Sequence, residues 1–280
     1  MPTNPTHTAP APRVWATDYV LWVEAFALGN LAFLALDIYI AHSENDFLRR
    51  PEYFPLYFSI AAPICLALAL LAREIWNNPS AWRITGYAVG LVSIALGVAG
   101  VVYHLDSQFF YERTIRSLTY AAPFAAPLAY TGVGLLLLLN RMVPGATEDW
   151  ARWVVFLTLG GFFGNLVLSL TDHAGNGFFH WTEWIPVVSA SFAVSFLAVF
   201  FLVPLTKHYL TACTIVLLLQ AVVGVAGFAL HAQADLHGPS RNVFQNIVNG
   251  APPFAPLLFP NLMVLGLIGL WASAKTRRGQ

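Results

Sequence analysis

The chain has 280 residues, of which 58% are hydrophobic and only 10% are charged. A soluble domain carries about 25% charged residues, so this composition excludes an ordinary soluble protein and is typical of a polytopic membrane protein. The formal net charge is zero, which gives no indication of nucleic-acid binding. The two cysteines lie in separate apolar stretches without a C-x-x-C motif, so neither a disulfide framework nor a thiolate metal site is expected.

Apolar stretches long enough to cross a bilayer follow one another along the chain. A spanning helix needs about 20 apolar residues. Residues 1–17 contain a Pro- and Thr-rich start without an apolar core and are predicted to be a disordered tail. The fold class is therefore an all-α integral membrane protein in a lipid bilayer. Eight transmembrane helices are predicted, at Tyr19–Ala41, Tyr53–Ala72, Ile84–Tyr103, Ser117–Asn140, Trp153–Thr171, Trp184–Thr206, Tyr209–Leu230 and Asn242–Ala274.

The basic residues are divided unevenly between the two ends of these helices. Eight spans put both termini on one side, and nine basic residues lie near that side against five near the other. Cytoplasmic loops carry the excess of Lys and Arg, so both termini are predicted to be cytoplasmic, in a bacterial inner membrane. The opposite side is richer in acids and is expected to face the periplasm or exterior. The nine are Arg13, Arg73, Arg83, Arg141, Arg152, Lys207, Lys275, Arg277 and Arg278; the five are Arg49, Arg50, Arg113, Arg116 and Arg241.

Four short matches between the two parts of the chain predict an internal duplication. Residues 18–141 then form a first four-helix half and residues 150–274 a second. Each half has an even number of spans, so a pseudo-twofold axis along the membrane normal relates them. In order, the matches are Gly29-Asn30-Leu31 with Gly164-Asn165-Leu166, Glu52-x-x-Pro55 with Glu183-x-x-Pro186, Gly97–His104 (G-V-A-G-V-V-Y-H) with Gly224–His231 (G-V-A-G-F-A-L-H), and Pro123-Phe124-Ala125 with Pro253-Phe254-Ala255.

Glycine and proline mark further features of these helices. Gly97 and Gly100 share one helix face with His104, and such a glycine stripe lets another helix approach closely. Proline suits the first turn of a helix, where its missing N–H needs no partner. We therefore expect the fourth helix to open near Ala122-Pro123 and the eighth near Gly250-Ala251-Pro252-Pro253.

The four helices that rise to the exterior side each end in a histidine with an aspartate nearby. Ionisable groups at this depth are costly and usually mark function. Imidazole binds iron, copper, zinc or haem, and a neighbouring carboxylate adds non-haem iron or zinc. Not all eight groups can share one centre, so the aspartates either orient the histidines or act elsewhere. The histidines are His42, His104, His173 and His231, which pair as His42 with His104 and His173 with His231; the aspartates are Asp37, Asp106, Asp172 and Asp235.

Other interpretations of these polar residues remain open. A histidine at a helix C-terminus is favoured by the helix dipole, so the four can be structural caps that a duplication copied. Asn30 and Asn165 lie at equivalent mid-membrane positions, where they form either an interhelical hydrogen bond or part of a polar path. Glu24 near the cytoplasmic end is either a proton-entry residue or a side chain that reaches back to the interface.

The layout of two four-helix halves with histidine pairs on the outward side is similar to that of the haem A synthase family. The loop signatures of that family are absent here, so the resemblance implies only that such a layout can hold haem. It implies no activity and no role for an individual residue.

Three functions are consistent with the sequence. The first is a membrane protein that binds haem or a transition metal at the histidines and carries out redox or electron-transfer chemistry, with a periplasmic redox partner. The second is a transporter or channel for a small solute or proton, with Asp37, Asp172, Asn30 and Asn165 along its path. The third is a non-catalytic subunit or assembly factor of a larger membrane complex.

Overall fold

A computed structural model describes residues 18–145 and 147–278, and within these ranges the chain is helical without strands. The disordered tail predicted for residues 1–17 lies outside them. Among the residues described, seven helices are long and apolar enough to cross a membrane, counting the short 3-10 turns that lead into three of them. They are α1 (Tyr19–Ser43), α2 (Tyr53–Ile75), α3 (Pro79–Asp106), α7 (Glu148–Gly175), α8 (Trp184–Val199), α9 (Lys207–Leu236) and α11 (Leu258–Arg278).

An eighth apolar helix, α6 (Leu128–Met142), is shorter. Fifteen residues rise only about 22 Å at 1.5 Å per residue, less than the roughly 30 Å of a bilayer core. The prediction that this helix opens near Ala122-Pro123 is wrong, as is the prediction that the last one opens near Gly250–Pro253. In both places the proline-containing residues form irregular turns. The helix begins about five residues later, at Leu128 in α6 and at Leu258 in α11.

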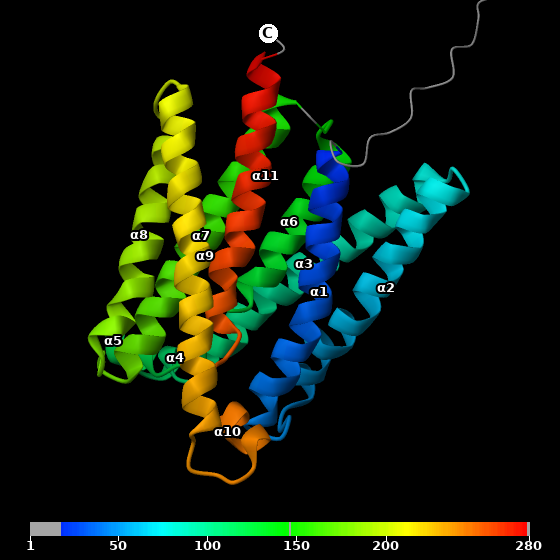
Figure 1. The fold of residues 1–280 in the computed structure, drawn as a ribbon. Helices are drawn as coiled ribbons and strands as arrows, with labels where there is room; N and C mark the ends of the chain where they lie inside the picture. The colour runs from blue at the N-terminus through cyan, green and yellow to red at the C-terminus, as the bar shows by residue number, and fades with distance from the viewer. Residues whose placement is uncertain (1–17, 146, 279–280) are drawn as a thin grey trace, which may run out of the picture.

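The seven long helices and α6 pack as two groups of four. In the first group α1 and α3 each contact both α2 and α6, and in the second α7 and α9 each contact both α8 and α11. The two groups meet where α6 contacts α7 and where α1 contacts α11. The start of α1 and the end of α11 lie at the same end of the bundle, the upper end in Figure 1. We call this the terminal end, and the opposite end the histidine end.

Capping side chains start each helix that runs from the terminal end to the histidine end. A side-chain oxygen at the N-cap satisfies one of the backbone N–H groups that a helix leaves free in its first turn. Such bonds fix where α1, α3, α7 and α9 begin, and so set the level at which their last residues lie. The caps are Asp18, Asn78, Thr147 and Thr206, which accept from the N–H groups of Leu21, Ala81, Trp150 and Tyr209.

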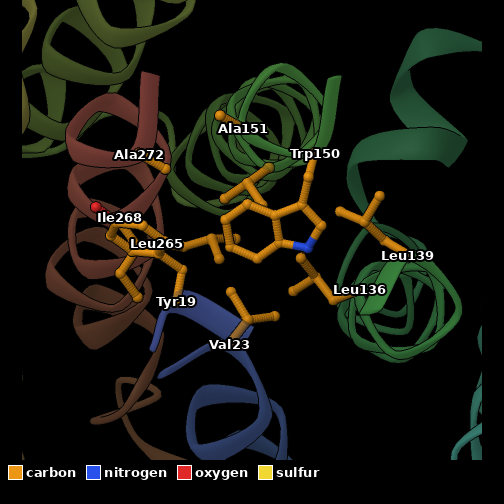
Figure 2. Close-up of a cluster of buried hydrophobic side chains, with 10 residues drawn as sticks. Tyr19, Val23, Leu136, Leu139, Trp150, Ala151, Leu265, Ile268 and Ala272 are labelled. Atoms are coloured by element: carbon orange, nitrogen blue, oxygen red, sulfur yellow. The ribbon is translucent and has the colours of Figure 1, made fainter. Parts of the chain in front are cut away.

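The contact between the two groups is built around a buried tryptophan. Trp150 at the start of α7 is fully buried, and Figure 2 shows its indole between α1, α6 and α11. The ring of Tyr19 packs at 6.2 Å from it, measured between centroids. Close packing of these aromatic and aliphatic side chains stabilises the junction through van der Waals contacts. The rest of the cluster is Val23, Leu136, Leu139, Ala151, Val154, Leu265, Ile268 and Ala272.

Short helices cover the histidine end, where α4 (Phe109–Glu112), α5 (Ile115–Thr119) and α10 (Val243–Asn249) lie in Figure 1. They cross between the groups: α5 contacts α7, and α10 contacts α1. One such contact is that of the Tyr39 and Phe244 rings, at 6.4 Å between centroids. The covering segments therefore tie the two groups together at this end.

The glycine stripe brings α3 against α6, as its sequence indicates. A Cβ on Gly97 would lie 2.2 Å from Thr131 Oγ1 and 2.9 Å from the carbonyl oxygen of Pro127. Gly224 on α9 has the same relation to α11, with a Cβ 2.6 Å from the carbonyl oxygen of Pro256. Contacts with backbone atoms cannot be relieved by side-chain rotation, so both positions require glycine.

Replacing Gly97 by alanine is expected to destabilise the protein by about 1–3 kcal/mol, the usual cost of overpacking. The matched control is Gly29→Ala, because nothing lies within 4 Å of a Cβ there. That variant should be neutral or slightly stabilising, since alanine is the better helix former. Thermal unfolding of the detergent-solubilised protein measures both. Equal midpoints for the two variants would show that the close approach of α3 and α6 is unimportant.

Candidate functional site

The four helix-end histidines lie in two pairs, as expected. The rings of His42 and His104 have centroids 6.3 Å apart with planes at 77°, and those of His173 and His231 are 6.5 Å apart at 89°. We call these the first and second histidine pairs. Each pair joins the ends of two helices of one group, α1 with α3 and α7 with α9. The two pairs therefore have nearly equal spacing and orientation.

One histidine of each pair is held by a backbone carbonyl from the turn that precedes α6 or α11. His104 Nδ1 lies 2.9 Å from the carbonyl oxygen of Pro123, and His231 Nδ1 lies 2.9 Å from that of Pro252. A carbonyl oxygen can only accept, so Nδ1 carries the proton in both rings. In the neutral imidazole this leaves Nε2 with its lone pair free.

The carbonyl groups are themselves anchored to the helix that carries the histidine. Ser107, three residues after the first histidine, accepts the N–H of Ala122 through Oγ at 2.9 Å. Asp235, four residues after the second, accepts the N–H of Ala251 through Oδ1 at 3.1 Å. These N–H groups immediately precede the prolines that hold the rings. Different side chains thus do the same work in the two groups, and Asp235, which holds a turn through Oδ1, also interacts electrostatically with His231.

A carboxylate that the sequence interpretation did not include accompanies the other histidine of each pair. His42 Nδ1 is 3.7 Å from Glu52 Oε2, and His173 Nδ1 is 3.8 Å from Glu183 Oε2. Both glutamates end a 3-10 turn, η2 (Arg50–Glu52) or η3 (Trp181–Glu183), at the N-terminus of α2 or α8. A helix N-terminus favours an anion, which accounts for this location.

Each glutamate is fixed through one oxygen and leaves the other without a hydrogen bond. Glu52 Oε1 accepts from Asn45 Nδ2 at 3.1 Å, and Glu183 Oε1 accepts from the N–H of His180 at 3.3 Å. The Oε2 atoms are buried and make no hydrogen bond. The oxygen that faces the histidine is therefore the free one in both groups.

The loops between histidine and glutamate contain strained backbone. Phe47 and Phe178 adopt φ of 51°, in the left-handed region that a bulky residue rarely occupies. Each phenylalanine donates its N–H to the backbone carbonyl of the histidine five residues before it, at 3.0 Å to His42 and 2.9 Å to His173. Their rings lie 5.8 and 6.2 Å from the two imidazoles, between centroids. Strain of this kind costs about 1–3 kcal/mol and is found mainly at functional sites.

A signal for these glutamates is present in the sequence. The matched pairs Glu52-x-x-Pro55 and Glu183-x-x-Pro186 extend upstream into the pattern H-x-x-N-x-F-x-x-x-x-E-x-x-P in both groups. The pattern links histidine, asparagine, phenylalanine and glutamate at identical spacing. Matched separately, the glutamates and the histidines indicate only a repeat; the shared spacing is what connects them.

The other predicted aspartates do not join the histidine pairs. In the described part of the chain, Asp37, Asp106 and Asp172 make no hydrogen bond or ion pair with any of the four histidines. Asp172 is exposed, while Asp37 and Asp106 are partly buried. Their assignment as metal ligands stays a prediction without a contact that supports it.

Glu24 does not reach back to the interface, so that interpretation is wrong. Its side chain is 1% exposed and accepts two hydrogen bonds from Arg141, at 2.5 and 2.6 Å. Asn140 Nδ2 lies 3.4 Å from the same carboxylate, and Trp150 Nε1 donates to Asn140 Oδ1 at 3.1 Å. The Arg141 guanidinium also lies 4.2 Å above the Trp82 ring. The carboxylate is therefore paired inside the bundle, and a proton-entry role for Glu24 stays a prediction.

The two mid-membrane asparagines differ in their contacts. Asn30 Oδ1 accepts from Asn261 Nδ2 at 2.7 Å, which confirms the interhelical hydrogen bond expected there and joins α1 to α11. Asn165 is 4% exposed, and its Nδ2 is buried without a hydrogen bond. Neither contact pattern supports a continuous polar path.

No group of three or more His, Cys, Asp or Glu side chains within residues 18–145 and 147–278 is close enough together to hold a metal ion as the side chains stand. Each histidine pair offers two imidazoles. Their centroid separations of 6.3 and 6.5 Å and steep interplanar angles are those of an edge-to-face contact between two rings.

No family model, curated protein or solved structure matches this chain.

Proposed function

We propose that this chain is an eight-span membrane metalloprotein whose two histidine pairs each hold one redox-active metal centre at the outer end of the bundle. The observation that carries the proposal is the tautomer fixed at His104 and His231. Both donate Nδ1–H to a carbonyl and keep Nε2 free. Metal-binding histidines are usually oriented by such a hydrogen bond from the other ring nitrogen.

The metal is an iron or copper centre, held either as haem or as an ion. Imidazole is a common ligand of haem iron, and it is also a common ligand of copper and non-haem iron. Both metals change oxidation state by one electron, so two such sites suit electron transfer at one membrane face. A periplasmic redox partner would exchange these electrons.

The membrane arrangement of this proposal has eight crossings, with α6 as the fourth. Its short length is made up by the irregular residues before it, where the carbonyl of Pro123 binds His104; such backbone is tolerated at membrane depth only where protein or water covers it. The matching contacts of the two groups support a duplicated four-helix unit with a pseudo-twofold axis along the membrane normal. The excess of basic residues at the terminal end supports cytoplasmic termini.

A purely structural role for the histidines is the main alternative. Each ring of His104 and His231 joins its helix to the turn before the next one, which by itself would stabilise the bundle. A transporter has less support, since Glu24 and Asn30 are engaged with Arg141 and Asn261. Within the described residues, no contact favours an assembly subunit over a structural role or a transporter.

The purified wild-type protein should contain two iron or copper atoms per chain. The measurement is elemental analysis together with the visible spectrum of protein expressed in medium supplied with both metals. A haem protein would show a Soret band, and a metal-ion protein would not. Folded protein that contains neither metal, and takes up neither on reconstitution, would leave the structural role.

A further inference from the structure

The buried carboxylates of Glu52 and Glu183 have no hydrogen bond on the oxygen that faces a histidine. Their side chains are 12% and 13% exposed. A buried charged oxygen without a partner is costly and requires an explanation. The same situation occurs twice, at the same distance from an imidazole, so chance placement of one side chain does not account for it.

We infer that Glu52 and Glu183 are positioning residues that hold the proton of His42 and His173 on Nδ1, so that all four histidines present Nε2 to a ligand. In each case the contact between the carboxylate and its histidine joins Oε2 to Nδ1, at 3.7 and 3.8 Å. An Nδ1–H directed at a carboxylate is the arrangement of a carboxylate–histidine–metal triad. The distances are those of an ion pair and are longer than a hydrogen bond.

A glutamate beside each histidine pair would also affect which oxidation state of a bound metal is favoured. A carboxylate next to two imidazoles leaves a local negative charge that a metal cation would compensate. Glu52 interacts electrostatically with both His42 and His104. It therefore stabilises a more highly charged oxidation state over a less charged one, whichever metal is bound.

The glutamate is held in place by the strained loop. Asn45 binds Glu52 Oε1 and also accepts the N–H of Phe47, whose positive φ brings the chain back towards the helix end. In the second group Asn176 accepts the N–H of Phe178 in the same way. In the first group the strained loop thus positions the asparagine that binds Glu52, whereas in the second Glu183 is held by the N–H of His180.

The tautomer of the histidines tests the inference without a metal. In the metal-free protein labelled with ¹⁵N-histidine, NMR at alkaline pH should show the proton on Nδ1 for all four rings, with signals assigned from single His→Gln variants. Protons on Nε2 of His42 and His173 would overturn the inference.

Copper affinity provides the second test, which rests on the proposed function. Glu52→Gln and Glu183→Gln should each weaken Cu(II) binding at one histidine pair by about 10- to 100-fold, the usual effect of removing such an orienting group. If the affinity for the oxidised metal alone falls tenfold, the one-electron reduction potential rises by about 59 mV. The matched control is Glu44→Gln, an exposed carboxylate in the same loop, which should bind copper as the wild type does.

Different results would contradict the role of the glutamates and the presence of metal centres. Unchanged copper affinity and potential in Glu52→Gln and Glu183→Gln, with binding lost in His42→Ala, would overturn the role of the glutamates and leave the histidine pairs. Wild-type protein that binds neither copper nor haem would overturn the metal centres, and the tautomers would still decide the role of the glutamates.

Discussion

Replacing His42 by alanine should reduce the bound metal from two atoms per chain to one. The change removes one of the two imidazoles of the first histidine pair and leaves the second pair, whose helices belong to the other group, unaltered. His173→Ala should have the same effect on the second pair, and the double variant should contain no metal. Elemental analysis of purified protein, together with the visible spectrum, measures the result.

His237 provides the matched control for this experiment. It lies at the end of α9, where its Nδ1 bonds to the carbonyl of Gln233 one turn back in the same helix, at 2.8 Å. It is thus an ordinary helix-end histidine, and His237→Ala should retain both metals. Equal losses in His42→Ala and His237→Ala would indicate that the metal binds exposed histidines adventitiously. Full retention of metal in the His42/His173 double variant would refute the assignment of the sites.

Removal of the Glu24 carboxylate should produce a large loss of stability. Glu24→Gln leaves the Arg141 guanidinium uncompensated at 0% side-chain exposure. Breaking a buried ion pair on one side costs about 3–5 kcal/mol, which should lower the thermal unfolding midpoint of the solubilised protein by several degrees. Arg141 has no room to move, because it fills the space beside Gly86, where a Cβ would lie 1.8 Å from its Nε.

The chain contains an exposed pair of the same type as a control. Glu148 and Arg277 lie 3.4 Å apart with side chains 36% exposed. Such pairs contribute about 0–1 kcal/mol, so Glu148→Gln should change the unfolding midpoint little. Replacing both buried partners, as in Glu24→Leu with Arg141→Leu, should recover much of the loss, because it removes the uncompensated charge. A Glu24→Gln midpoint equal to that of Glu148→Gln would mean that the buried pair does not hold α1 to α6.

The sequence by itself determined the features that depend on local spacing. Hydrophobic length predicts the long helices, and periodicity places Gly97 and His104 on one face of α3. The histidines were assigned to helix ends and grouped into the correct pairs because the same pattern occurs in both parts of the chain. The motif shared by His42 and Glu52 was also available, since its members are ten residues apart in both copies.

The tertiary structure alone decided how polar groups are partnered. Glu24 and Arg141 are 117 residues apart, and Asn30 and Asn261 are 231 apart, so no local pattern joins them. The orientation of the His104 and His231 imidazoles likewise depends on a carbonyl in a turn before another helix. In a membrane the apolar surfaces of helices are nearly interchangeable, so which helices become neighbours is set by close packing and by hydrogen bonds between them. Those contacts exist only after the helices have assembled.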